Sequence, residues 1–350
     1  MKKILVYGSY GYTGQLIVER AMQEGLSLIL AGRDEKRVRE QAKKYKLEYR
    51  VFAVEETAKL DAALQEVDAV LHCAGPFVLT FQVMAEACIC NKKHYVDISG
   101  EIEGFEALAA MDEEAKRAGV MLLPGGGFDV VPSDCLSAYV AHKLPSATDL
   151  KIYIKGIGGG LSRGTARSGI ENSQRQGRVR RDGKIVGVPN AWDIKHIDFG
   201  RGPSQLISIG WGDVSTAYHS TRIPNIITYM SFPKPAVTMM KLTRYLGFIL
   251  YTRAAKDILK WLVGVVIPSG PSREKNEKGF SLMIAEVSDG EETFRAKLRT
   301  PEGYWLTSMT AVEIMKHILA GDLKTGFQTP STAYGADFIL QFDGVQREDL

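Results

Sequence analysis

Three glycines near the N-terminus have the spacing of a phosphate-binding loop. Gly8, Gly11 and Gly14 directly follow a short apolar run and open a stretch of helical length that ends near Gly25. Glycine lets the backbone turn tightly and approach a pyrophosphate, whose charge is stabilised by the free N–H groups and positive dipole end of the helix. The segment predicts a nucleotide-binding site, with an ordinary tight turn as the alternative. The residues assigned to this site are Gly8, Tyr10, Gly11, Tyr12, Thr13 and Gly14.

The end of the second apolar run indicates which nucleotide binds. In NAD-binding proteins an acidic residue about 20 residues beyond the glycines holds the ribose 2′-hydroxyl. Here the run ends in Gly32 and Arg33, and the planar guanidinium of Arg33 suits a 2′-phosphate. We therefore expect NADP(H) as the cofactor. Asp34 is the neighbouring feature that favours NAD, and a role of Arg33 in a solvated turn is the alternative.

The elements that must position these residues alternate between two types. From Lys2 to about Leu123, short apolar β-rich runs alternate with amphipathic stretches of helical length. This pattern is typical of βαβ units wound into a doubly wound parallel sheet, and we expect an α/β Rossmann domain at 1–132. The strands are expected at Lys3–Tyr7, Ser27–Ala31, Arg50–Ala53, Ala69–Cys73, Tyr95–Ile98 and Val120–Leu123.

The pattern changes after Pro132. Longer alternating runs appear, and two of them flank Asp289-Gly290, which is a strong hairpin signal. We therefore expect an inserted α+β domain at 133–300, built on a mixed or antiparallel sheet, that serves the substrate or dimerisation. A helix within 301–350 is expected to return and complete the Rossmann domain.

Together, these segments resemble the saccharopine dehydrogenase-like family of NADP-linked oxidoreductases, which includes trans-acting enoyl reductases. The motifs lie within the first 135 residues, and their order and spacing are more specific than any one of them. They are Gly8–Gly14, Ala31–Arg33, Ala74–Pro76, His94–Asp97 with Gly100-Glu101, and Gly127–Asp129 with Pro132–Asp134. The resemblance also implies cofactor contacts beyond the glycine loop. These contacts are Ala74, Gly75, Pro76, Ser99 with Gly100, Gly127 and Phe128, of which Gly75, Gly100 and Gly127 are nearest the nicotinamide.

The resemblance further implies transfer of a hydride between NADPH and a C=C or C=N bond of a small-molecule substrate held at a domain cleft. We assign Asp129, Tyr95 and Arg163 to this site as proton relay, hydrogen-bond donor and anion anchor, respectively. Two alternatives stay open. Tyr139 and Lys143 fit the YxxxK pair of short-chain dehydrogenases. The other alternative is a cofactor-sensing protein that keeps the nucleotide site without turnover.

A basic segment lies in the expected second domain. From Arg163 to Lys184, seven basic residues stand against Glu171 and Asp182, a local charge of 7 minus 2, or +5. Such a cluster could steer a phosphate-bearing acyl thioester toward the protein, or it could be a solvated loop.

Further along, apolar stretches between Pro235 and Pro268 carry basic residues at intervals. A basic amphipathic helix pair of this type fits a membrane surface, a lipophilic substrate or a subunit interface, with ordinary core packing as the alternative. We expect a homodimer, with peripheral membrane contact as a further option.

The composition excludes several classes of protein. The charge of 44 basic minus 41 acidic residues, or +3, is too balanced to favour nucleic-acid binding. The cysteines form no CxxC pair, so we expect reduced thiols and no metal site. The first apolar run is too short for a signal peptide, and no apolar run reaches the length of a membrane span. We therefore expect a cytoplasmic enzyme.

Overall fold

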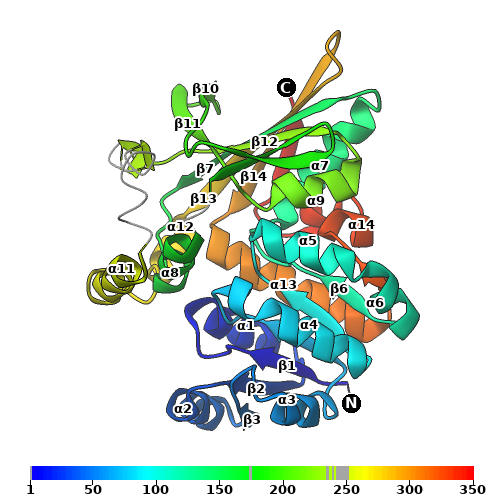
Figure 1. Ribbon diagram of the computed structural model, residues 1–350, viewed down its shortest axis with the longest axis vertical. Coiled ribbons are helices and arrows are strands. Elements are labelled where there is room, and N and C mark those ends of the chain that lie inside the picture. Colours follow the sequence, from blue (N-terminus) through cyan, green and yellow to red (C-terminus); the bar gives the residue numbers. More distant parts are fainter. Residues whose placement is uncertain (1, 173–175, 234–235, 239, 242–251) are drawn as a thin grey trace. The chain divides into compact units, whose positions relative to one another are not determined.

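The chain of this computed structural model divides into two units (Figure 1). The first unit consists of Met1–Val131 and Tyr304–Ala333, and the second consists of Pro132–Gly303 and Tyr334–Leu350. The structure describes residues 2–172, 176–233, 236–238, 240–241 and 252–350. Arg175 and much of the apolar stretch before residue 252 therefore lie outside the described residues.

The described residues of the first unit form a seven-stranded sheet in the order β15-β6-β5-β4-β1-β2-β3, and all of its strand pairs are parallel. This is the Rossmann strand order with one added edge strand, so the predicted fold class is confirmed. The strands are β1 (Ile4–Tyr7), β2 (Leu28–Gly32), β3 (Glu48–Val51), β4 (Ala69–His72), β5 (His94–Asp97), β6 (Met121–Leu123) and β15 (Gly326–Phe327).

Helices connect these strands and bury both faces of the sheet. They are α1 (Tyr12–Gln23), α2 (Glu35–Tyr45), α3 (Thr57–Leu64), η1 (Phe77–Leu79), α4 (Phe81–Cys90), α5 (Ile102–Ala110), α6 (Asp112–Ala118), α13 (Gly303–Ala320) and α14 (Pro330–Tyr334). Each of five neighbouring strands supplies a fully buried side chain to one core cluster: Leu5, Ile29, Val70, Tyr95 and Leu122. Burial on both faces explains why these strands read as short apolar runs.

The second unit contains a mixed sheet in the order β10-β11-β12-β7-β13-β14-β16, to which β8 and β9 attach through β12. Strands β7 and β12 are parallel, and the other neighbours along this order are antiparallel, as the prediction of a mixed sheet required. The strands are β7 (Asp149–Ile157), β8 (Gly177–Arg181), β9 (Lys184–Val188), β10 (Ile194–Asp198), β11 (Pro203–Ile209), β12 (Asn225–Met230), β13 (Phe280–Ser288), β14 (Thr293–Pro301) and β16 (Gln346–Asp349).

The helical elements of the second unit are α7 (Val131–Lys143), α8 (Arg163–Asn172), α9 (Asp213–Thr221), α11 (Arg253–Val266), α12 (Arg273–Lys278) and η2 (Phe338–Gln341). The Asp289-Gly290 signal marks the turn between β13 and β14, which pair antiparallel over their whole length. The helix that was expected within 301–350 to complete the Rossmann domain corresponds to α13, and Tyr304–Ala333 belong to the first unit. Residues 334–350 instead belong to the second unit, because β16 pairs with β14.

Candidate cofactor and active site

The cofactor loops of the first unit meet where the strand order reverses, between β1 and β4. Ligands of open α/β sheets bind at this point, outside the carboxyl ends of the strands. Gly8 directly follows β1 with a φ of +82°, and a Cβ added there would lie 2.8 Å from the backbone nitrogen of Ala74, which follows β4. The two loops therefore come this close only because Gly8 has no side chain.

The glycine loop is tightly wound and leads into an uncapped helix. The Gly8 N–H donates to the Ala31 carbonyl at 2.8 Å, and the Gly11 N–H donates to the Gly8 carbonyl at 2.9 Å. A Cβ on Gly14 would lie 2.5 Å from the Gly8 carbonyl oxygen. Within this fully described stretch, no side chain caps the start of α1 and its first turn holds no acidic residue. This cradle fits the pyrophosphate of a dinucleotide.

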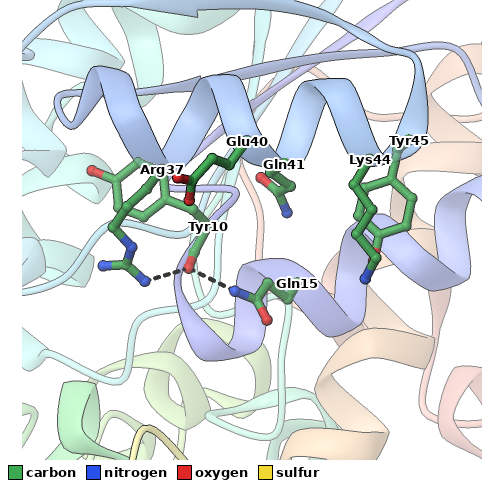
Figure 2. Close-up of a pocket in the computed structure, with 7 residues that line it drawn as sticks. All are labelled: Tyr10, Gln15, Arg37, Glu40, Gln41, Lys44 and Tyr45. Atoms are coloured by element: carbon green, nitrogen blue, oxygen red, sulfur yellow. Dashed lines mark hydrogen bonds between the residues drawn. The ribbon is translucent and has the colours of Figure 1, made fainter.

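Tyr10 lies between Gln15 of α1 and Arg37 of α2 (Figure 2) and contacts the end of β2. A Cβ on Gly32 would lie 2.4 Å from the Tyr10 ring, so the ring occupies the space that a side chain would need. The Tyr10 carbonyl accepts hydrogen bonds from Gln15 Nε2 at 3.0 Å and Arg37 Nη2 at 2.8 Å, and the Arg37 guanidinium lies 4.6 Å from the ring centroid. Arg37, in the first turn of α2, was not predicted as a site residue, because nothing in the local sequence indicated its contact with Tyr10.

The acidic residue that favoured NAD has a different role. The Asp34 side chain caps α2 by accepting a hydrogen bond from the Arg37 N–H at 3.1 Å. Its own N–H donates to the Tyr10 hydroxyl at 3.3 Å. Arg33, by contrast, is exposed at the end of β2. The end of β2 therefore offers a guanidinium, and the neighbouring carboxylate is committed to the helix.

A buried histidine, His72, supports the loop that follows β4. His72 Nε2 lies 2.8 Å from the Thr80 hydroxyl, which also lies 3.2 Å from the Ala74 carbonyl and 3.4 Å from the Phe77 carbonyl. Burial lowers the pKa of His72 to about 3, so the ring is neutral at physiological pH. A neutral ring that donates through Nε2 leaves the Thr80 hydroxyl proton for a carbonyl. This pair positions the predicted Ala74, Gly75 and Pro76 contacts.

Asp97 joins the loops that follow β5 and β6. Its carboxylate accepts hydrogen bonds from the Tyr95 hydroxyl at 2.6 Å and from the N–H groups of Ser99 and Gly125, each at 2.9 Å. The side chain is fully buried, and burial raises the pKa of Asp97 above its usual value. Tyr95 is also fully buried. Tyr95 therefore supports the loops from within the core. We had assigned it as a hydrogen-bond donor that faces the substrate, and its burial does not fit that role.

Helix α13 supports the loop that contains Gly127 and Phe128. The Phe128 N–H donates to the Thr307 hydroxyl at 2.9 Å, and the Thr310 hydroxyl donates to the Gly126 carbonyl at 2.9 Å. A Cβ on Gly127 would lie 2.8 Å from the Thr307 side chain. Neither threonine was predicted, because nothing local in the sequence links α13 to this loop.

Asp129 places a carboxyl group with a raised pKa beside these loops. A Cβ on Gly100 would lie 3.0 Å from Asp129 Cβ and 3.2 Å from its Oδ2, so the two predicted site segments touch. Burial raises the pKa of Asp129 to about 7. Among the residues that the structure describes, no hydrogen-bond donor offsets this burial. A carboxyl group half protonated near neutral pH is suited to donate or accept a proton.

The remaining assigned residues belong to the second unit. Arg163 begins α8, and its Nε donates to the Ile267 carbonyl at 3.1 Å. The Tyr139 hydroxyl donates to Asp349 at 2.8 Å, and the Arg347 guanidinium lies 3.4 Å from the Tyr139 ring centroid. The YxxxK tyrosine is therefore engaged by the C-terminal strand.

The described part of the basic segment, which leaves out 173–175, forms a helix and a hairpin and not the solvated loop that we gave as the alternative. Its described members lie on α8 and on the β8–β9 hairpin. Arg180 is buried, donates to the Val214 carbonyl at 2.8 Å and lies 4.1 Å from the Tyr218 ring centroid. Arg181 and Lys184 are exposed. Only the exposed members are available to attract an anionic substrate.

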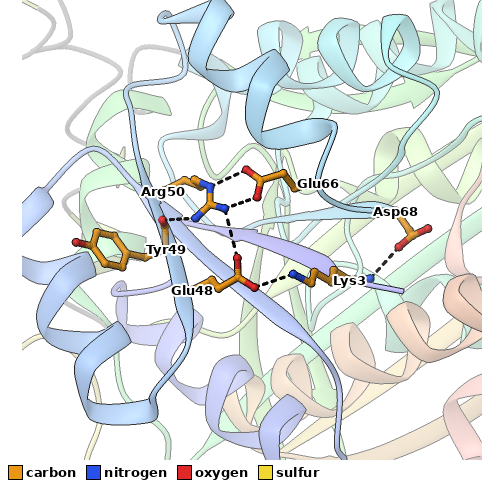
Figure 3. Close-up of polar contacts among 6 residues, drawn as sticks. All are labelled: Lys3, Glu48, Tyr49, Arg50, Glu66 and Asp68. Carbon is orange, nitrogen blue, oxygen red and sulfur yellow. Dashed lines mark hydrogen bonds and ion pairs between the residues drawn. The ribbon is translucent and has the colours of Figure 1, made fainter. Parts of the chain in front are cut away.

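The opposite, amino-terminal edge of the first sheet carries an ion-pair network (Figure 3). Lys3 Nζ lies 2.7 Å from Glu48, and Arg50 pairs with both Glu48 and Glu66. The Lys3 N–H donates to Asp68 at 2.8 Å. These hydrogen bonds hold the pKa of Glu66 below its usual value, chiefly through Arg50. The network ties the ends of β1, β3 and β4 together on the side away from the cofactor loops.

Among the described residues, no three or more His, Cys, Asp or Glu side chains are grouped to hold a metal ion. A helix both long and apolar enough to cross a membrane is likewise not found in the described part of the chain.

Removing the Asp97 carboxylate should destabilise the first unit strongly. Asp97→Ala leaves two N–H groups and the Tyr95 hydroxyl buried without an acceptor, and each unsatisfied group costs about 1–3 kcal/mol. We expect the free energy of unfolding in urea to fall by about 3 kcal/mol or more. Asp97→Asn keeps an acceptor oxygen for both N–H groups and should cost less than half as much. Equal losses in the two variants would show that the hydrogen bonds do not support the loops.

Arg33 should set the preference for NADPH over NADH. A charge-assisted contact with the 2′-phosphate is worth about 1.5–3 kcal/mol, so NADPH should bind roughly 10- to 150-fold more tightly in calorimetric titrations. Arg33→Ala should remove this preference and leave NADH affinity within about twofold. Arg39→Ala, which removes an exposed arginine of α2, is the matched control. Equal affinities in the unmodified protein would refute the assignment.

The network at the other edge should affect stability only weakly. Arg50→Met removes partly exposed ion pairs and should lower the free energy of unfolding by about 1 kcal/mol or less. Because the pKa of Glu66 is lowered in the folded state, this contribution is present above the unfolded pKa of about 4.3 and is lost as the pH falls below it. Thermal unfolding at pH 7 and pH 3 measures both effects. A change in NADPH affinity would contradict the separation of the two edges.

Comparisons with known proteins agree with this geometry. Residues 4–123 match the family model for the saccharopine dehydrogenase NADP binding domain. A lipid droplet localized protein from Caenorhabditis elegans is 30% identical over 145 residues, which cover 37% of this chain and 34% of that protein. The human saccharopine dehydrogenase-like oxidoreductase is 27% identical over 161 residues, which cover 40% of this chain and 38% of that protein. The chain thus matches little more than a third of the length of these relatives.

The fold of the whole chain also has a solved counterpart. Apo histidine-tagged saccharopine dehydrogenase (L-Glu forming) from Saccharomyces cerevisiae aligns over 100% of both chains with a TM-score of 0.66 and 13% sequence identity. At this identity the likeness concerns the fold. The loops at the β1–β4 reversal, the uncapped α1 and the family match together confirm the resemblance seen in the sequence: residues 4–123 are similar to the NADP binding domain of saccharopine dehydrogenase.

Proposed function

We propose that the protein is an NADPH-dependent oxidoreductase that reduces a C=C or C=N bond of a small-molecule substrate. The observation that carries the proposal is Asp129, a carboxyl group whose pKa is raised to about 7 by burial and which lies against Gly100 of the cofactor loops. The match to the family model indicates NADP(H) as the cofactor, and several relatives are named oxidoreductases.

Reduction of either bond needs a hydride and a proton on adjacent atoms. Bound NADPH supplies the hydride. Asp129 in its protonated form supplies the proton to the second atom and is reprotonated from solvent between turnovers. The loops around it are held by Asp97 and Thr307, so the carboxyl group is presented by a fixed backbone.

An acyl thioester is the substrate class that we propose to test first. The exposed cations Arg167, Arg181 and Lys184 would attract the phosphates of a coenzyme A or phosphopantetheine arm over a distance set by ionic strength. Turnover of a charged thioester should then fall steeply between 0.1 M and 1 M salt, whereas turnover of a neutral truncated analogue should change little.

The function is tested by following NADPH oxidation with a panel of enoyl thioesters, imines and ketones, together with product mass. One reduced product per NADPH consumed is expected for a C=C or C=N substrate. Tight NADPH binding with no turnover on any member would favour the alternative of a cofactor-sensing protein.

Asp129→Asn should separate proton donation from cofactor binding. General acids contribute about 10²–10⁴-fold to rates, so we expect kcat to fall by at least about 100-fold while the NADPH Kd stays within about threefold. Because the protonated form is the active one, kcat of the unmodified enzyme should decline as the pH rises through about 7, and this decline should be absent in the variant. Asp343→Asn, at an exposed carboxylate of the second unit, is the control. A variant with an unchanged rate and pH profile would exclude Asp129 as the donor.

A further inference from the structure

Helix α11 exposes an apolar face to solvent. Ile258, Trp261, Leu262 and Val265 follow the spacing that places residues on one side of a helix, and their exposed fractions are 60%, 66%, 42% and 68%. Val266 at the end of the helix is 75% exposed. Large apolar side chains gathered in this way mark a surface that binds something.

The other side of α11 is unusually polar for a face that packs on protein. Lys256, Lys260 and Gly264 recur every four residues on that side, and Lys256 is only 8% exposed. A Cβ on Gly264 would lie 3.4 Å from the Arg167 guanidinium of α8, which packs beside α11 (Figure 1). The helix thus turns its lysines toward its neighbour and its most apolar residues outward. This is the reverse of a helix that packs on a soluble core.

The same helix pair carries a concentrated positive charge. The sequences of α8 and α11 contain five basic and two acidic residues, a charge of 5 minus 2, or +3, which equals that of the whole chain. The residues counted are Arg163, Arg167, Arg253, Lys256, Lys260, Glu171 and Asp257.

We propose that α11 lies in the surface of an anionic phospholipid membrane, with Ile258, Trp261, Leu262 and Val265 facing the acyl chains. Amphipathic helices bind such surfaces through buried apolar area together with attraction of nearby cations to anionic lipids. Tryptophan is favoured at the boundary between headgroups and acyl chains. The inference does not depend on the redox reaction, because none of these residues belongs to the cofactor site.

A second copy of the chain fits this face less well. A twofold interface places the same patch on both partners, so the +3 charge of the helix pair would face itself. A specific interface also buries about 800 Å² per partner, more than one helical stripe of five side chains offers. Anionic lipid instead neutralises this charge.

The test is flotation of the protein with vesicles of phosphatidylcholine alone or with about 30% phosphatidylserine. We expect binding to the anionic vesicles that is at least tenfold stronger than to neutral ones and that weakens as salt is added. Ile258→Ser with Val265→Ser should lower binding to anionic vesicles at least tenfold. Leu340→Ser with Leu350→Ser, which removes two exposed apolar residues elsewhere, should leave it unchanged.

Charge is tested separately by Arg167→Gln with Lys260→Gln. Each lost cation near an anionic surface should weaken binding about fivefold. NADPH affinity and thermal unfolding of every variant confirm that the fold and the cofactor site are intact. Equal flotation of the unmodified protein and the Ile258/Val265 variant, or no flotation of either, would overturn the proposal. So would a stable dimer in sedimentation velocity that the same serine substitutions dissociate, because α11 would then be a subunit interface.

Discussion

The closeness of two backbone loops at Gly8 and Ala74 is the constraint on which the first unit depends. Parallel strands bring the loops after β1 and β4 to the same edge of the sheet, but side chains normally keep such loops apart. Here a Cβ on Gly8 would lie 2.8 Å from Ala74. The absence of a side chain at Gly8 therefore allows the glycine loop to lie this close to the loop that contains Gly75 and Pro76. A cradle for a long, thin dinucleotide needs this closeness, because phosphates are held by backbone N–H groups.

The loops that follow β4, β5 and β6 are fixed in place by hydrogen bonds to polar side chains. Thr80 and His72 hold the Ala74 side, and Asp97 holds the loops after β5 and β6. A buried carboxylate is costly alone, but one that accepts three hydrogen bonds fixes three groups at once. Asp129, which lies against Gly100, has no such set of donors among the described residues, and burial raises its pKa to about 7.

The sequence predicted the parts of the site that depend on local pattern. Strand positions, the place of the glycine loop between β1 and α1, and the Asp289-Gly290 hairpin follow from short-range spacing, and each was confirmed. Asp34 could also have been recognised as a helix cap, because aspartate is favoured directly before a helix. The burial of Tyr95 could not have been predicted in this way, because both faces of a parallel strand are apolar and the sequence does not show which side chains lie inside the core.

Other features depend on contacts between distant parts of the chain. Thr307 and Gly127 are 180 positions apart, and no local property of either residue predicts that they touch. The pairing of β16 with β14, which assigns 334–350 to the second unit, is of the same kind. The buried state of Arg180 is a third case, because a run of basic residues in sequence suggests solvent and only the fold shows its partners.

The support given by α13 has a consequence for the order of events during protein synthesis. The Gly126–Phe128 loop is synthesised before Pro132–Gly303 of the second unit, whereas the threonines that hold this loop are synthesised after it. Domains tend to fold as units as soon as their chain is available. Here the hydrogen bonds of Thr307 and Thr310 to this loop can form only after Pro132–Gly303 of the second unit has been translated.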